Sequence, residues 1–296
     1  MTFEQLRVFV EVAAQLHMTR AAERLNMTQP AVSASIGALE ASCGTHLFHR
    51  VGRRIELTEA GHLFLIEARA ILERVSRAEA VLNDISGLRR GTLSVHASQT
   101  IANYWLGPRI ARYRALHPGI ALKVEIGNTA EGVAALMEGK ADLAFVEGEV
   151  SEAPLVRLAV PGDRLVLVVG RTHPWAGRTD IGAQDLVATD WVMRERGSGT
   201  RQMFEDGCRA YGVDPRSLTV TLEFPSNEAV LSAVAAGAGA TVISELVVEA
   251  GLATGALFLV PLAFPARAFF ILRHADRYRS RAEEALLELV REDRRG

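Results

Sequence analysis

Two segments of the chain carry side chains suited to molecular recognition, and the first lies close to the amino terminus. Residues 18–40 read MTRAAERLNMTQPAVSASIGALE, and within them Gln29 and Ser33 are spaced about one helical turn apart. A glutamine amide can pair with adenine through two hydrogen bonds, and a serine hydroxyl can donate to several base edges. These residue types at this spacing therefore indicate recognition of DNA.

The pattern around these residues predicts a helix-turn-helix. A first helix runs from about Thr19, its expected cap, to Leu25, and Asn26 tolerates the left-handed conformation of a sharp turn. Thr28 caps the second helix, and Pro30 occupies its first turn, where a missing N–H costs nothing. Helical spacing predicts that four side chains of this helix face inward: Val32, Ile36, Leu39 and Cys43.

The surface expected to meet DNA comprises this second helix and a wing that follows it. On the helix, the expected contact residues are Thr28, Gln29, Pro30, Ser33 and Ser35. Residues 47–61 predict two short strands joined by a tight turn, which would hold Arg50, Arg53 and Arg54 beside the phosphates. The alternatives are a capped helix hairpin with a polar outer face and a charge run that is merely solvated.

In these segments the chain resembles the LysR-type transcriptional regulators in residue type, order and spacing. The matching stretches are Ala21-Ala22-Glu23-Arg24-Leu25, Thr28-Gln29-Pro30-Ala31-Val32-Ser33, Leu39-Glu40, Leu47-Phe48-His49-Arg50 and Leu57-Thr58-Glu59-Ala60-Gly61. The likeness is specific over residues 1–61 and looser over the rest of the chain. It implies binding to double-stranded promoter or operator DNA as a homodimer or homotetramer, with RNA polymerase as a further candidate partner.

The recognition helix departs from the family pattern at one place. Many members carry basic residues just after the serine, whereas this chain has Ala34, Ser35 and Gly37 there. Specificity is therefore expected to depend more on Gln29, Ser33, the wing and DNA shape than on direct reading of guanine.

Composition and charge restrict the class of protein. A chain of 296 residues, of which 49% are hydrophobic, allows two or three domains with real cores. The net charge is −2, and residues 1–60 hold six arginines against six glutamates, so one head should bind DNA weakly and several heads together tightly. No signal-peptide pattern or membrane-spanning run is recognised, and Cys43 and Cys208 fall in different predicted domains, which favours the cytoplasm.

Residues 59–88 contain no proline and predict one long helix. Apolar residues recur at steps of four and three, at Phe64, Ala68, Ile71, Val75, Ala78, Leu82 and Ile85. This is the period of a coiled-coil seam, so we expect a dimerisation helix that places two recognition helices on one face of a duplex. The alternative is a helix that lies on its own domain.

The remaining residues, 89–296, alternate predicted strands and helices, which indicates an α/β fold with a largely parallel sheet. A helix is expected over about 101–116 and a strand over 165–169. One lobe covers about 91–160 and 267–296, and the other covers about 161–266. Two lobes joined by two crossings resemble the periplasmic-binding-protein fold, as the family's effector domains do. The predicted fold is therefore multidomain: an all-α winged helix-turn-helix domain over residues 1–58, a linker helix, and a two-lobed α/β domain.

The second recognition segment should lie in the cleft between these lobes, where ligands of such folds bind. The expected effector-binding residues are Ser98, Gln99, Thr100, Glu147, Gly197, Ser198, Gly199, Thr200, Arg201, Asn227 and Glu228. Gly197 and Gly199 let backbone N–H groups point inward, the hydroxyls add donors, and the following helix offers its positive end, which suits a small oxyanion or carboxylate. Glu147 would repel an anion unless it is paired or protonated, and Arg201 is a possible partner. Another possibility is that Glu147 accepts from a protonated ligand. The alternative is a Gly-Ser turn with a helix cap and no ligand.

Together these features predict a ligand-responsive transcriptional regulator. The GSGTR loop, with the ASQT and VEG segments, looks like the subgroup that regulates sulfur assimilation and carbon-dioxide fixation, which implies sulfite, sulfate, or a phosphorylated or carboxylate metabolite as the effector. An α/β enzyme or a solute-binding protein that uses the same cleft is the alternative. The sequence shows no Gly-x-Ser-x-Gly elbow, Walker loop or HExxH motif, so we expect no enzymatic activity, cofactor or metal.

Overall fold

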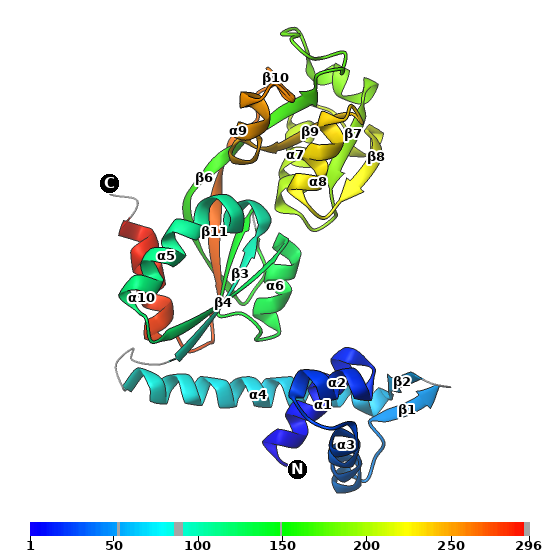
Figure 1. Ribbon diagram of the computed structural model, residues 1–296, viewed down its shortest axis with the longest axis vertical. Helices are drawn as coiled ribbons and strands as arrows, with labels where there is room; N and C mark the ends of the chain where they lie inside the picture. Colours follow the sequence, from blue (N-terminus) through cyan, green and yellow to red (C-terminus); the bar gives the residue numbers. More distant parts are fainter. Residues whose placement is uncertain (52–53, 86–90, 149, 293–296) are drawn as a thin grey trace. The chain divides into compact units, whose positions relative to one another are not determined.

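The computed structural model describes residues 1–51, 54–85, 91–148 and 150–292, and the chain divides into two compact units (Figure 1). The first, Met1–Ile85, is called the head unit, and the second, Ser86–Gly296, the α/β unit. No helix in the described ranges is both long enough and apolar enough to cross a bilayer.

The head unit is a small helical domain with a two-stranded hairpin. Its elements are α1 (Phe3–Gln15), α2 (Met18–Leu25), α3 (Gln29–Cys43), β1 (Phe48–Val51), β2 (Arg54–Leu57) and α4 (Glu59–Ile85). Phe9, Val32 and Leu39 are fully buried in its single core. The turn of the predicted wing, Gly52-Arg53, lies outside the described residues, while the antiparallel strands on either side confirm the hairpin.

Helix caps explain where the helix-turn-helix begins and turns. Asn26 has φ 53°, the left-handed conformation expected of it, and the Thr28 hydroxyl accepts from the N–H of Ala31 at 3.4 Å. The predicted cap at Thr19 is wrong, because α2 begins one residue earlier and the His17 ring accepts from the N–H of Arg20. Cys43, expected to face inward, is exposed since it ends α3 where the chain turns away at Gly44.

Helix α4 corrects the predicted coiled-coil seam. Ala68 is fully buried in the core of the head unit, with Phe64 and Ile71 packed against the same core. The first half of the seam therefore covers the chain's own domain, which was the alternative reading for the whole helix. Two other apolar side chains of this half, Leu63 and Ile66, are about two-thirds exposed, at 64% and 66%.

The α/β unit is built on one nine-stranded sheet in the order β4-β3-β5-β11-β6-β9-β7-β8, with β10 also paired to β6. The strands are β3 (Gly91–Ser98), β4 (Ile120–Gly127), β5 (Leu143–Glu147), β6 (Leu155–Gly170), β7 (Asp190–Arg194), β8 (Thr219–Phe224), β9 (Ala240–Ser244), β10 (Leu257–Val260) and β11 (Ala266–His274). Parallel pairing is confined to β3 with β4 and β5 and to β7 with β8 and β9. The sheet is thus mixed rather than largely parallel, because β6 and β11 are antiparallel to their neighbours.

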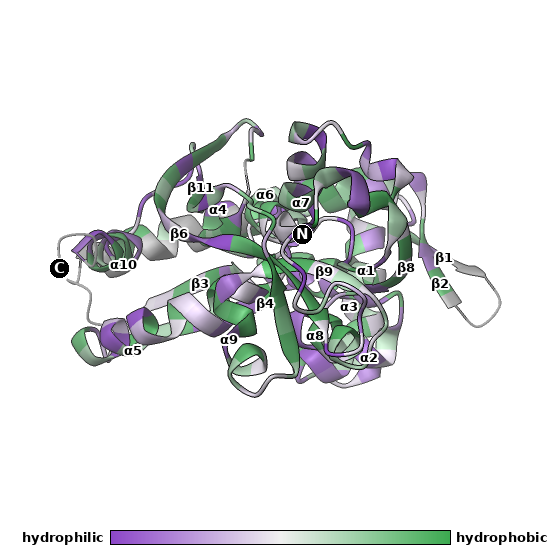
Figure 2. Cartoon of the chain, turned by 90° about the horizontal axis from the view of Figure 1, so that it is seen from above, coloured by the Kyte–Doolittle hydropathy of each residue, from purple (hydrophilic) through white to green (hydrophobic). Residues whose placement is uncertain are grey.

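Helices cover this sheet. They are η1 (Ile101–Leu106), α5 (Gly107–Leu116), α6 (Thr129–Met137), η2 (Ala183–Ala188), α7 (Gly199–Ala210), η3 (Pro215–Ser217), α8 (Asn227–Ala235), α9 (Glu245–Ala253) and α10 (Arg281–Glu292). Hydrophobic and hydrophilic residues mix along α5 and α10, as expected of helices with one face on a sheet (Figure 2). The helix predicted over 101–116 is two segments, since its first six residues are π-helical.

The two lobes of this unit are joined by β6 and β11 (Figure 1). The first part of β6 pairs with β11, and its last part pairs with β9 and β10. The predicted strand over 165–169 is therefore only the end of a longer strand, whose earlier part the Pro161-Gly162 pair concealed. Lobe I contains β3, β4, β5 and α6, and lobe II contains β7, β8, β9 and α7.

Candidate functional site

Helix α3 presents the predicted base-reading residues on the surface of the head unit. Gln29 and Pro30 are exposed, and Ser33 and Ser35 are half-buried. The Gln29 amide donates to the Ser33 hydroxyl at 2.8 Å, so the two side chains support one another. An amide held in this way loses less conformational freedom when it meets a base.

The wing is attached directly to the last turns of α3. The Glu40 carboxylate accepts from the backbone N–H groups of Leu47 and Phe48 at 2.7 and 3.0 Å. Arg50 and Arg54 lie at facing ends of β1 and β2, in register with Ile55 and Val51, and Arg53 lies outside the described residues. The structure therefore brings recognition helix and wing strands together through a residue that the sequence analysis did not select.

Across the two lobes, the segment after β3 meets the start of α8. The Gln99 amide donates to the carbonyl of Pro225 at 2.8 Å and accepts from the N–H of Asn227 at 2.9 Å. The Asn227 amide donates to the hydroxyl of Thr100 at 3.2 Å, and both residues are fully buried. Three of the predicted residues therefore form one lobe-to-lobe contact.

Glu228 belongs to the same contact, at its exposed side. Its carboxylate accepts from Asn103 at 3.2 Å and from Ser226 at 2.8 Å. Burial alone would raise the pKa of the Glu228 carboxyl, but hydrogen bonds from its own backbone N–H, Ser226 and Asn103 bring it below the ordinary value.

The start of α7 lies against lobe I. Gly197 has φ 91°, and its carbonyl accepts from the N–H of Ala130 across the lobes at 3.2 Å. Gly199 is required by close approach, because a Cβ there would lie 2.3 Å from the carbonyl oxygen of Glu147. A cavity of about 440 Å³ opens here, and Glu147, Ser198 and Gly199 are among its lining residues.

A buried ionic network lies where β6 and β11 cross between the lobes. The Arg267 guanidinium donates to both carboxylate oxygens of Asp163, and to the Thr200 hydroxyl at 3.2 Å. Its Nη2 lies 4.0 Å from the Glu147 carboxylate, and Ser244 donates to Asp163. All five side chains are buried, so this network holds α7, β5 and both crossing strands together.

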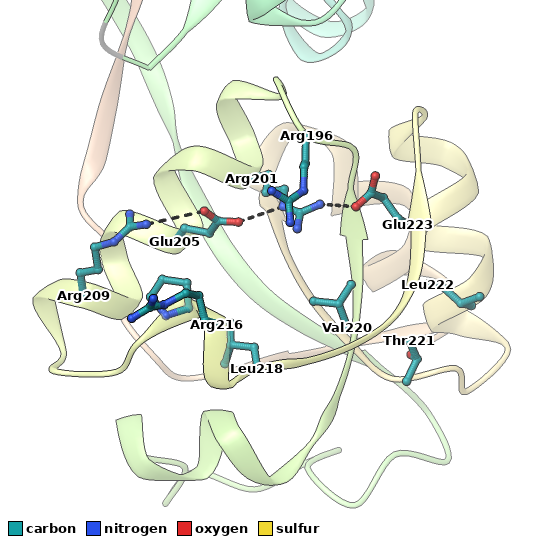
Figure 3. A pocket seen from close by; sticks show the side chains of 11 residues that line it. Arg196, Arg201, Glu205, Arg209, Arg216, Leu218, Val220, Thr221, Leu222 and Glu223 are labelled. Atoms are coloured by element: carbon teal, nitrogen blue, oxygen red, sulfur yellow. Dashed lines mark hydrogen bonds and ion pairs between the residues drawn. The ribbon is translucent and has the colours of Figure 1, made fainter.

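Arg201, the possible partner of Glu147, pairs with other carboxylates instead. Its guanidinium bonds to Glu205 at 2.9 Å and to Glu223 (Figure 3). These three residues line a second cavity of about 670 Å³, together with Arg196, Arg209 and Arg216. Burial alone would lower the pKa of Arg201, but the two carboxylates raise it above its ordinary value. Two nearer carboxylates hold Arg201, and Arg267 of β11 is the cation that approaches Glu147.

The network also shows what the sequence analysis missed. Arg267 is the one charged residue of the run Ala266-Arg267-Ala268-Phe269, and that setting was the available signal; Asp163 was harder to recognise because Arg164 follows it directly. Ser98, which was predicted, is 2% exposed and its hydroxyl has no hydrogen-bond partner within the described part of the chain. Within the described part of the chain, no three His, Cys, Asp or Glu side chains are placed so that they could hold a metal ion.

Comparison with known proteins covers both units. Residues 3–62 match the family model of bacterial regulatory helix-turn-helix proteins of the lysR family, and residues 86–295 match the LysR substrate binding domain. The RuBisCO operon transcriptional regulator of Allochromatium vinosum is 33% identical over 291 residues, covering 98% of this chain and 95% of that protein. The HTH-type transcriptional regulator YeiE of Escherichia coli (strain K12) is 32% identical over 289 residues, covering 97% of this chain and 96% of the relative.

A solved structure resembles the α/β unit. It is the regulatory domain of Synechocystis PCC6803 CcmR in complex with 2-PG, with a TM-score of 0.61 and 25% identity, covering 68% of this chain and 96% of that one. The relatives are named as transcriptional regulators, which agrees with a regulator rather than an enzyme.

Proposed function

Because the chain belongs to the LysR family of DNA-binding transcriptional regulators, we propose that its α/β unit senses a small anion bound at the start of α7, between the lobes. The single observation that supports this best is the state of that helix terminus. Ser198 is the N-cap residue and 3% exposed, yet its side chain makes no capping hydrogen bond. A buried helix start whose N–H groups lack a side-chain cap favours an anion.

We propose that two further hydroxyl groups contact the same ligand. Thr200 is buried at the start of α7, and Ser98 ends β3, which pairs in parallel with β5 so that both strands finish at one edge of the sheet. The Ser98 hydroxyl is buried without a partner, and a ligand that accepts its hydrogen bond would remove that cost. The proposed contacts are Ser98, Ser198, Gly199 and Thr200.

For the chemical class of the ligand, we propose a phosphorylated or carboxylate metabolite or a sulfur oxyanion. The likeness to the CcmR regulatory domain, solved with 2-PG, and to RuBisCO operon regulators supports this range. All of these ligands present oxygen atoms that backbone N–H and hydroxyl groups can bind.

The anion would act by favouring one arrangement of the lobes. Gln99 with Asn227, and Ala130 with Gly197, bond across the lobes. A ligand that binds the two arrangements unequally shifts their populations by that difference in affinity. The family binds DNA as oligomers, so a change of lobe arrangement would alter how paired head units meet their site.

Thermal unfolding with added anions tests the effector site. A ligand that binds only the folded form raises the melting temperature. Sulfite, sulfate, phosphate and small carboxylates are compared on the wild type and on Thr200→Val, with Thr241→Val as a control for loss of another buried hydroxyl. We expect Thr200→Val to reduce the effect of a stabilising anion and Thr241→Val to retain it. An unchanged anion effect in Thr200→Val would refute the placement.

A gel-shift series at stated salt concentrations tests the proposed DNA contacts. Replacing Gln29 and Ser33 with alanine removes donors from the exposed end of α3, so we expect specific sites to weaken by about 1–3 kcal/mol per lost base contact and random DNA to weaken less. Glu11→Gln, on α1, is the control. Equal losses on specific and random DNA would show that these residues read no bases.

A further inference from the structure

Glu147, which lines the cavity at the start of α7, carries a carboxylate that accepts no hydrogen bond from the described residues. The residue is 3% exposed and lines that cavity. Among the described residues, no N–H or O–H group donates to its carboxylate, and the nearest cation, Nη2 of Arg267, lies 4.0 Å away. A buried acceptor without a donor is costly, so a ligand that supplies a donor here gains more than one that does not.

Arg267 cannot neutralise Glu147 fully. Its Nε and Nη2 donate to Asp163, and its Nη1 donates to Thr200. The buried network therefore holds two carboxylates against one guanidinium. A deprotonated anion entering beside it would meet a net negative charge in surroundings of low dielectric constant.

Charged groups on the other walls of the cavity do not reverse this balance. Arg201 is paired with Glu205 and Glu223, and Glu152 adds another carboxylate. Arg196 is the remaining cation among the residues that line the cavity, and it is exposed to water, which screens its charge.

We propose that the cleft selects oxyanions that retain an O–H group, which donates to Glu147, and that it rejects oxyanions of the same shape that have none. The proposal rests on the proposed function, since it assumes an anion at the start of α7. A carboxylate only accepts hydrogen bonds, and so does sulfate near neutral pH. Hydrogen phosphate, the protonated form of a phosphate ester and hydrogen sulfite carry the O–H donor that makes a charge-assisted bond.

Selectivity of this kind is large because an anion without the O–H group is penalised in two ways. An anion without the proton leaves the Glu147 carboxylate without a hydrogen-bond donor and adds repulsion between two negative groups. A site built around one hydrogen bond rejects analogues that lack the donor far more strongly than a site built on shape alone. The start of α7 then provides the affinity for anions, and Glu147 determines which anions bind.

Two pairs of matched ligands test the proposal by isothermal titration calorimetry near neutral pH. Phosphate is compared with sulfate, and phosphonoacetate with sulfoacetate, so that a free ion and a substituted one are both covered. The variants are Glu147→Gln and the control Glu138→Gln, which removes an exposed carboxylate of lobe I outside the cavity. Far-ultraviolet circular dichroism and DNA binding confirm that each variant is folded.

We expect the wild type to prefer the phosphorus compound of each pair by at least about tenfold, and Glu138→Gln to keep that preference. Glu147→Gln presents an amide N–H₂ that donates to either anion, so its preference should fall by about tenfold or more, chiefly through tighter binding of the sulfur compound. Equal binding of both members of a pair by the wild type, or an unchanged preference in Glu147→Gln, overturns the selection by Glu147 but leaves the anion site intact. Failure of all four anions to bind overturns both.

Discussion

The head unit and the α/β unit differ in whether their polar side chains are exposed or buried. Every buried polar or charged side chain among the described residues lies between His96 and Glu283, within the α/β unit. The head unit instead buries apolar residues such as Phe9 and Leu39 and leaves Gln29 exposed. A duplex is too large to enclose, so it is met by an outer surface, whereas a small anion binds strongly only where water is excluded.

Two helix starts show the same contrast at the level of single residues. Thr28 caps α3 with its own hydroxyl, so that terminus is satisfied before any ligand arrives. Ser198 at the start of α7 makes no such bond. A capped terminus presents side chains to a partner, and an uncapped one presents backbone N–H groups. Four substitutions can break or sharpen this comparison.

Arg267→Met should have the largest effect. Removing the guanidinium leaves Asp163 and Glu147 buried without a cation, which we expect to destabilise the α/β unit by about 3–5 kcal/mol. Urea unfolding followed by tryptophan fluorescence reports on this unit, because all three tryptophans of the chain lie in it. Arg157→Met, which removes an exposed arginine from β6, is the control and should cost little. A loss below about 1 kcal/mol for Arg267→Met would show that the network is not held by this residue.

Glu283→Gln should change how the free energy of unfolding depends on pH, because Glu283 is another buried carboxyl group. Burial, and then the nearby Asp142 carboxylate, raise the pKa of Glu283 to about 7. The folded form therefore holds a proton that the unfolded form loses near its ordinary pKa of 4.5, so stability falls as pH rises from about 4.5 to about 7. Above that range we expect Glu283→Gln to be more stable than the wild type by about 2–3 kcal/mol.

The same pH series on Glu284→Gln is the control for Glu283→Gln, because Glu284 is half exposed and pairs with Arg279. Unfolding of both variants is followed from acid to mildly alkaline pH. Parallel stability curves for Glu283→Gln and the wild type would contradict the proposed burial of charge.

Thr28→Ala should have an intermediate effect. It removes the cap of α3, which we expect to cost the head unit about 1 kcal/mol. Thr19→Ala is the matched control, because Thr19 lies inside α2 and does not cap it. Circular dichroism that follows the unfolding of the head unit measures the loss of stability in both variants. Equal losses would mean that the cap at Thr28 adds no stability of its own.

Ser198→Ala should have the smallest effect on the free protein. No capping bond is lost, so its free energy of unfolding should change by less than about 0.5 kcal/mol. With a bound anion the variant should lose part of the anion's stabilisation, because the hydroxyl is then missing from the site. A large loss without ligand would indicate that Ser198 already has a structural partner and that the two helix starts are alike.

Much of the head unit could be predicted from sequence because its determinants are local. The turn at Asn26, the cap at Thr28 and the inward spacing of Val32, Ile36 and Leu39 all depend on neighbours within a few residues, and the structure confirms them. The role of α4 was less accessible. Its apolar period is the same whether the stripe covers a partner or its own domain, and only packing distinguishes the two.

The cleft was predictable in part, since strand ends and glycine-rich loops mark where segments meet. Gln99, Thr100 and Asn227 are brought together as expected, although 128 residues separate Gln99 from Asn227. The cation nearest to Glu147 was not predicted, because Arg267 lies 120 residues further along the chain and reaches it only through the antiparallel pairing of β11 with β5 and β6.

The sequence by itself determined the order of the elements in the head unit, the cap of α3 and the residues that α3 exposes, because each depends on residues close together in the chain. Only the tertiary structure decided which charges are buried together at Asp163, Arg267 and Glu147, and which helix start stays uncapped inside the cleft. The reason is physical: a buried charge is stabilised by whatever partner the fold brings within a few ångströms, and no local pattern specifies that partner.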